Sequence, residues 1–103
     1  DMTRPRSPSG QTRAVLELLS GDPARWRHGY ELSRETGIAS GTLYPLLMRL
    51  ADRGYLESRW EPTAAGRPPR HLYRLTAKGG QFAAQAARSA PGRVVPRPLQ
   101  GNA

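Results

Sequence analysis

The sequence predicts an α+β fold in which three short helices precede a β-hairpin and a fourth helix follows it. Three observations carry this prediction. Leucines recur at helical spacing through residues 15–50, and two segments with alternating apolar side chains, Tyr55–Glu61 and His71–Leu75, come after them. Between these segments lies Pro62–Arg70, a basic loop whose three prolines and one glycine keep it out of a sheet.

The length of 103 residues indicates one small domain. Residues 1–10 and 91–103 are polar and contain prolines, so we expect a flexible arm and a disordered basic tail around a domain at residues 11–90. Only 37% of the residues are hydrophobic. A second copy of the chain would therefore supply useful additional burial.

The first helix is expected at Gln11–Ser20, where Val15 and Leu19 mark one apolar face. A glycine followed by an Asp-Pro pair ends this helix. Residues 24–28 are expected to form a loop, with Trp26 packing beneath the helices.

A second helix is expected at Tyr30–Thr36 and a third at Ser40–Arg53, with Gly37 in the turn between them. The third helix has one buried stripe at positions i, i+3, i+4 and i+7, formed by Leu43, Leu46, Leu47 and Leu50. Its other side presents hydroxyl, aromatic and basic side chains.

The two strands should pair antiparallel, and period-two alternation puts Leu56 and Trp60 on one face of the first. On the second strand Tyr73 and Leu75 share a face. Trp60 is therefore interpreted as core at the base of the hairpin. Thr76 can cap a last helix, expected at residues 76–90.

Charge is the strongest compositional signal. Sixteen basic residues against eight acidic residues give a net charge of +8. Residues 1–40 are almost balanced, with six arginines and five acids, whereas residues 41–80 carry seven basic residues and three acids. The excess lies on the third helix, the hairpin and the tail, as expected for a surface that meets a phosphate backbone. A GC-rich genome is the alternative explanation for so much arginine.

Several classes of function are disfavoured. The chain has no cysteine, which removes disulfides, thiolate metal sites and a cysteine nucleophile. His28 and His71 stand in different segments without a further ligand pattern, and no phosphate-binding or hydrolase motif occurs. No apolar run approaches the roughly 20 residues of a membrane helix. We expect no enzyme activity, cofactor, metal or membrane contact, and a cytoplasmic, nucleoid-associated protein.

A helix preceded by a glycine turn and followed by a basic hairpin is the arrangement of a winged helix-turn-helix. In that fold the helix reads the major groove of DNA and the hairpin reaches the backbone or the next groove. The sequence thus predicts three helices, a two-stranded wing and a C-terminal helix that together bind double-stranded DNA.

The segments GTLYPLLMRL, GRPPR and LYRLT resemble the PadR family of bacterial transcriptional regulators, and HGYELSRETG resembles the second helix of that family. The similarity extends over roughly residues 16–79. The resemblance implies a winged helix-turn-helix regulator that binds DNA as a homodimer, most often as a repressor, on a pseudo-palindromic operator.

The first turn of the third helix and the wing are the expected contacts, because hydroxyls there can bond base edges and guanidinium groups can bond phosphates. The predicted DNA-binding residues are Ser40, Thr42, Tyr44, Pro45, Arg49, Arg53, Arg67 and Arg70. Tyr44 has an alternative role in the core. Arg49 and Arg53 have the alternative of solvation or pairing with Asp52 and Glu57, and the wing that of a solvated basic turn.

The first and last helices are expected to form the dimer interface, since both carry apolar faces. The predicted interface residues are Val15, Leu19, Phe82, Ala83 and Ala86. An unidentified small-molecule effector is a further expected partner. Two other functions stay open: a winged-helix module that binds protein or RNA with the same basic face, and a small ligand-sensing dimer.

Overall fold

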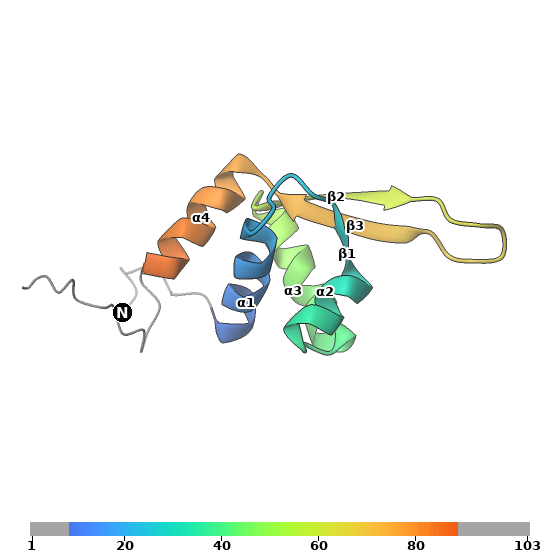
Figure 1. Cartoon of the computed structure of the whole chain (residues 1–103), viewed down its shortest axis with the longest axis horizontal. Coiled ribbons are helices and arrows are strands. Elements are labelled where there is room, and N and C mark those ends of the chain that lie inside the picture. Colours follow the sequence, from blue (N-terminus) through green and yellow to red (C-terminus); the bar gives the residue numbers. More distant parts are fainter. Residues whose placement is uncertain (1–8, 89–103) are drawn as a thin grey trace, which may run out of the picture.

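The structure is a computed structural model, and it describes residues 9–88. Helix α1 (Gly10–Ser20) is followed by the short strand β1 (Arg27–His28), and then by α2 (Gly29–Thr36) and α3 (Ser40–Asp52). Strands β2 (Leu56–Glu61) and β3 (Arg70–Leu75) form the wing, and α4 (Ala77–Arg88) ends the described part. Figure 1 shows the four helices gathered at one end and the wing projecting away from them.

The predicted α+β winged helix is confirmed, with one addition. The sheet has three antiparallel strands in the order β1-β3-β2, because Arg27 pairs with Tyr73 and His28 with Leu72. Arg27 and His28 were expected in a loop. Their strand conformation comes from the partner β3, which supplies the hydrogen bonds, and not from any apolar alternation of their own.

The helix boundaries follow from local capping. The Ser9 hydroxyl accepts a hydrogen bond from the Thr12 backbone N–H at 3.1 Å, so α1 begins one residue before the prediction, at the edge of the expected arm. Thr76 caps α4 as predicted, with its hydroxyl accepting from the Gly79 N–H at 2.9 Å. Residues 1–8 of the arm, the expected end of α4 at 89–90, and the tail at 91–103 lie outside the described residues.

The core lies between the helices and the near end of the sheet. The leucine stripe of α3 is buried as predicted and packs against apolar side chains of α1 and α2 and of strands β2 and β3. Tyr73 is 1% exposed, and burial together with the neighbouring Tyr44 raises its pKa to about 12. No helix within residues 9–88 is long and apolar enough to cross a membrane.

Trp26 is not beneath the helices. Its ring contacts the guanidinium groups of Arg59 and Arg74, whose Cζ atoms are 4.6 and 4.3 Å from the ring centroid. Arg74 also donates to Glu57 at 3.0 Å. Because Trp26 precedes β1, it covers the outer face of the sheet, and this cation–π stack fastens β1 to the wing strands.

Candidate nucleic-acid interface

Helix α3 has a buried side and an exposed side. Leu43, Leu46, Leu47 and Leu50 are at most 6% exposed, which fixes the rotation of the helix about its axis. That rotation leaves the predicted contacts Ser40, Thr42, Pro45, Arg49 and Arg53 exposed. Met48, 59% exposed, lies on the same outer side and was not predicted as a site residue.

The N-terminus of α3 is open to a ligand. Ala39 is the N-cap residue and supplies no side-chain hydrogen bond, and the first turn contains no acidic residue. The partial positive charge of the helix end is therefore not neutralised by the helix itself. Pro45 has no N–H, so the Gly41 carbonyl also loses its usual helical donor. This turn can offer both donors and acceptors to a groove edge.

Tyr44 combines its two predicted roles. Its ring is half-buried against the core, while its hydroxyl lies directly against Gly29 at the start of α2. A Cβ at position 29 would overlap the phenol, so glycine is required there for α2 and α3 to approach. Tyr44 thereby lines a cleft without being fully exposed.

The basic residues of α3 remain available to a partner. Within residues 9–88, neither Arg49 nor Arg53 takes part in an ion pair. The alternative that Arg53 pairs with Glu57 is wrong, because Glu57 holds Arg74. The Arg53 carbonyl instead accepts from Lys78 Nζ at 3.0 Å, which ties the end of α3 to α4.

The wing loop is exposed but internally bonded. The Thr63 hydroxyl lies 3.1 Å from the Arg67 carbonyl oxygen and 2.9 Å from that of Pro68, and donates across the loop. The Arg67 N–H donates to the Ala64 carbonyl, and Gly66 takes the positive φ of 84° that this turn requires. The loop therefore holds Arg67 in place without any core contact.

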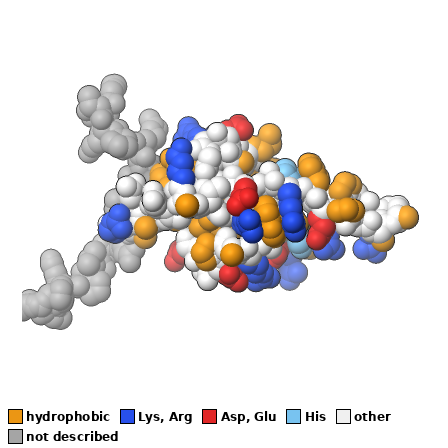
Figure 2. Space-filling model, turned by 90° about the horizontal axis from the view of Figure 1, so that it is seen from above, with side chains coloured by type: hydrophobic (Ala, Val, Ile, Leu, Met, Phe, Trp, Pro, Cys, Tyr) orange, Lys and Arg blue, Asp and Glu red, His pale blue; other side chains and the backbone are white. Residues whose placement is uncertain are grey.

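Arg67 and Arg70 stand on different backbone elements, but both carry a positive charge that is not paired within residues 9–88. Arg67 is on the loop, whereas Arg70 is the first residue of β3 and lies opposite Glu61 in the ladder. Both side chains are exposed, and neither is in an ion pair within the described part of the chain. Figure 2 shows that the projecting end of the molecule carries both hydrophobic and basic side chains.

A single cleft of about 540 Å³ joins the start of α2, α3 and the wing. Its lining is aromatic and basic, and contains no aspartate or glutamate. The lining residues are His28, Gly29, Tyr30, Tyr44, Trp60, Thr63, Arg67, Pro68, Pro69, Arg70 and His71.

The sequence analysis was wrong about Trp60. The side chain is 63% exposed and stacks on His71, its cross-strand partner, with ring centroids 4.1 Å apart and an 11° interplanar angle. The Tyr73 hydroxyl is 2.8 Å from Nδ1 of His71, and burial lowers the pKa of that histidine. The alternation of β2 predicted the correct face, but the strand extends beyond the helices at Trp60, and the hydrophobic core does not cover this side chain.

A charged cluster missed by the sequence analysis positions α2. Arg27, 5% exposed, donates from Nε to Glu31 and from Nη2 to Glu35 at 2.7 Å. Burial alone would lower the pKa of Arg27, but the hydrogen bonds that it donates to both carboxylates, together with their negative charge, outweigh burial and raise that pKa. The i, i+4 spacing of Arg27 and Glu31 was the available signal. No group of three metal-ligating side chains occurs within residues 9–88.

Four of the five predicted dimer residues are buried within the chain. Val15, Leu19, Ala83 and Ala86 are at most 8% exposed, because α1 and α4 pack against each other. Phe82 is half-buried and stacks on Tyr55, with centroids 4.2 Å apart. These side chains have little surface left for a second copy, so any interface on these helices must use their outer residues.

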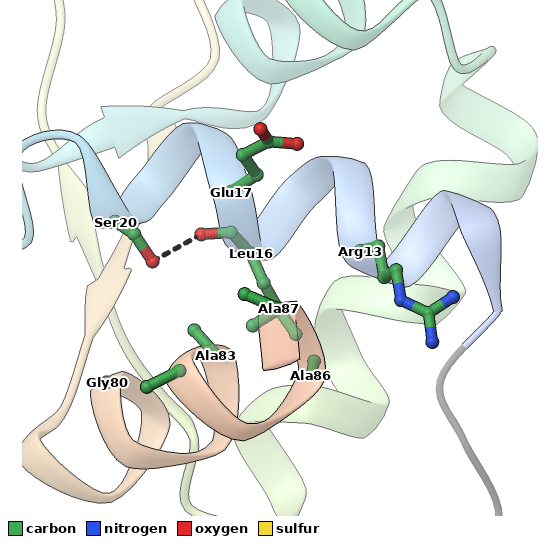
Figure 3. Close-up of a pocket in the computed structure, with 9 residues that line it drawn as sticks. Arg13, Leu16, Glu17, Ser20, Gly80, Ala83, Ala86 and Ala87 are labelled. Carbon is green, nitrogen blue, oxygen red and sulfur yellow. Dashed lines mark hydrogen bonds between the residues drawn. The ribbon is translucent and has the colours of Figure 1, made fainter. Parts of the chain in front are cut away.

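An open groove of about 440 Å³ lies between α1 and α4 (Figure 3). Leu16 and Arg13 line it from α1, and small residues line it from α4. The Ser20 hydroxyl donates to the Leu16 carbonyl at 2.7 Å on one wall. The remaining lining residues are Glu17, Ser20, Gly80, Ala83, Ala84, Ala86 and Ala87.

The fold and the cleft together define a winged helix-turn-helix, the class of protein that reads DNA with one helix and a wing. Residues 15–85 match the model of the transcriptional regulator PadR-like family. The chain belongs to this family, which consists of transcription factors and not of enzymes.

Solved structures agree with this membership. A PadR-like transcription factor from Bacteroides fragilis is 28% identical, with a TM-score of 0.65, over 76% of this chain and 77% of that one. A PadR-family regulator from Eggerthella lenta is 33% identical, with a TM-score of 0.60, over 72% of this chain and 68% of that one. No curated protein matches significantly.

The fold is shared more widely. The PcaV transcriptional regulator from Streptomyces coelicolor, solved with its natural ligand, is 23% identical with a TM-score of 0.68. The match covers 81% of this chain but 55% of PcaV. At that identity the likeness shows a common fold alone.

Proposed function

We propose that the protein binds double-stranded DNA sequence-specifically, as a homodimeric repressor on a pseudo-palindromic operator in the bacterial nucleoid. One observation carries this proposal: a single cleft is bordered by the α2–α3 unit on one side and by two unpaired wing arginines on the other. A duplex that places α3 in its major groove would bring the adjacent backbone to the wing.

The first turn of α3 is the proposed reading element. Ser40 and Thr42 are exposed beside an uncapped helix end, and Pro45 and Tyr44 add apolar surface suited to a thymine methyl group. Arg49 and Arg53 lie further along the same helix, where guanidinium groups meet phosphates. Reading and anchoring are thereby distributed along one helix.

The wing is the proposed electrostatic clamp. Arg67 and Arg70 are exposed and form no ion pair within residues 9–88, so each can displace counterions from the DNA backbone. The bonded loop reduces the loss of conformational entropy when these side chains engage. This term acts on any DNA sequence and adds affinity without specificity.

Dimerisation is proposed through the outer surface of α1 and α4, over the groove of Figure 3. Small residues on α4 permit a close approach of a second helix, and a two-fold axis would double the DNA contacts. A charged substitution in the interface should separate the two copies. At Leu19 or Ala86 it would instead unfold the chain, because both are core residues. Ala84 is exposed and is therefore the position at which to place the charge.

Selection from a random duplex library with the purified chain tests the DNA proposal. Enrichment of an inverted repeat, with half-sites about one helical turn apart, is the expected result. Enrichment of no duplex sequence, or preferential binding of RNA over duplex DNA in a competitive gel shift, would contradict it.

Sedimentation tests the dimer. The wild-type chain should sediment as a dimer, and Ala84→Glu should shift it toward monomer while circular dichroism stays unchanged. Gln81→Glu, an exposed change on the same helix outside the groove lining, is the matched control. A wild-type chain that is monomeric while it binds the inverted repeat tightly would refute the proposed interface.

A further inference from the structure

We propose that the cleft between the wing and α2–α3 is also a binding site for a small planar anion, whose ring stacks on Trp60 and whose negative group is held by Arg67 and Arg70. The site itself is independent of the DNA proposal. Only its consequence, competition with DNA, rests on the function proposed above.

The first argument is the state of Trp60. A tryptophan on a soluble surface usually buries most of its ring, yet this side chain is 63% exposed. One face lies flat on His71, which in turn leans on Tyr73 with centroids 4.5 Å apart. These ring contacts orient the indole, and within residues 9–88 its opposite face has no aromatic or cationic partner. A planar ring is the group that such a face binds best.

The second argument is the charge of the lining. The cleft carries two arginines that form no ion pair with any residue from 9 to 88, and no acidic side chain lines it. Glu61 lies opposite Arg70 in the ladder, but it forms no ion pair within residues 9–88 and does not line the cleft. Glu31 faces a neighbouring hollow and is held by Arg25 and Arg27. An anion entering the cleft would therefore meet two guanidinium groups and no carboxylate in the lining itself.

The third argument is size and rigidity. A volume of about 540 Å³ lies within the range of roughly 300–1,000 Å³ usual for small-molecule sites. Tyr30, 67% exposed, and Tyr44 supply aromatic surface opposite the wing. The Thr63 hydroxyl bonds to the backbone of the loop that carries Arg67, which restrains one wall of the site.

The chemistry defines a ring and an anion, and two sources provide it: a nucleoside monophosphate, or an aromatic carboxylate. Either one would cover Trp60 and engage the wing arginines. Since those arginines are also the proposed DNA clamp, the occupied cleft and the bound operator exclude each other. The regulator would thus be released by direct competition at the wing.

Indole resonances of the nitrogen-15-labelled full chain provide the test, and no DNA is needed. AMP and 4-hydroxybenzoate are the two probes, with cyclohexanecarboxylate and inorganic phosphate as non-aromatic controls. We expect at least one aromatic probe to shift the Trp60 indole N–H saturably and at least about tenfold more tightly than either control. Trp26, in contact with Arg59 and Arg74 on the outer face of the sheet, should not move.

Two variants make the test specific. Arg67→Ala with Arg70→Ala should weaken the aromatic probe at least about tenfold, whereas Arg59→Ala, a matched arginine on the other face, should not. Trp60→Leu should abolish saturable binding, which is then followed by calorimetry. The proposal is overturned if neither aromatic probe binds, if the controls bind equally well, or if the arginine variants bind unchanged. Those results leave the DNA-selection experiment untouched, so the two proposals fail separately.

Discussion

Helix α3 and the wing lie on two sides of one cleft but are held in place by different forces. Four leucines of α3 are buried in the core, so the helix is both a structural element and the proposed reading surface. From residue 62 to residue 70 every wing residue except Thr63 is exposed, and the loop is ordered by its own hydrogen bonds. Stability and recognition are therefore coupled in α3 and separable in the wing.

The difference between the buried helix α3 and the exposed wing arises from the burial of the wing strands. Leu56, at the root of β2, is 3% exposed and packs against the core, but the next four residues of β2 are exposed. From Glu57 onward β2 therefore gains little from apolar burial, whereas the paired strand β3 remains buried as far out as Leu72. Charge and aromatic rings placed there add little to folding and remain available to partners.

The largest predicted effect is in α3. Leu47→Ala removes a side chain with no exposed surface and should lower the free energy of unfolding by about 2–5 kcal/mol. Its neighbour Met48 is 59% exposed, so Met48→Ala should change stability by about 0.5 kcal/mol or less. Urea denaturation of both variants measures the contrast, and equal losses would show that α3 is not anchored by its stripe.

The next effect concerns the buried arginine that ties β1 to α2. Arg27→Met leaves Glu31 and Glu35 without their shared partner and should cost about 1–3 kcal/mol of unfolding free energy. Arg25→Met removes an arginine that is 55% exposed and should cost about 0–1 kcal/mol. Thermal denaturation compares the two. If Arg27→Met proves as stable as Arg25→Met, the buried cluster does not support α2.

The smallest effect is a pH dependence of stability from His71, near the loop end of the wing strands. Burial lowers the pKa of His71 below its ordinary value of 6.5, so the unfolded chain binds the proton more readily than the folded one. The stability that the folded state keeps while His71 is neutral is complete above pH 6.5 and is lost as the pH falls through the folded pKa. His71→Phe should therefore lose less stability than the wild type between pH 7 and pH 5. Parallel losses would assign the acid sensitivity to other groups.

Much of the helical half could be predicted from sequence, because periodicity reports a buried face directly. The leucine stripe, the Gly37 turn and the Thr76 cap are all where the pattern put them. Periodicity cannot say which element covers a face. The apolar sides of α1 and α4 were assigned to a second copy of the chain, whereas the structure packs them against each other.

The features that sequence reasoning missed depend on contacts between distant segments. The strand at Arg27–His28 exists because β3 offers a free edge, and two polar residues carry no alternation to reveal it. Trp60 has the alternation of a core residue, but its position along β2 lies beyond the helices. In both cases the missing information is which segments lie beside one another in the fold. The aromatic cleft was missed for the same reason.

The central claim is that α3 gives specificity while the wing gives charge-driven affinity. The decisive measurement is the salt dependence of binding to a selected operator and to random DNA, for Thr42→Ala and for Arg67→Ala with Arg70→Ala. Thr42→Ala should weaken the operator by about 1–3 kcal/mol and leave random DNA almost unchanged. The double wing variant should weaken both DNAs and lower the slope of log K against log salt by about 0.9 for each phosphate that an arginine no longer neutralises. Equal losses on both DNAs for Thr42→Ala, or an unchanged slope in the wing variant, would contradict the account.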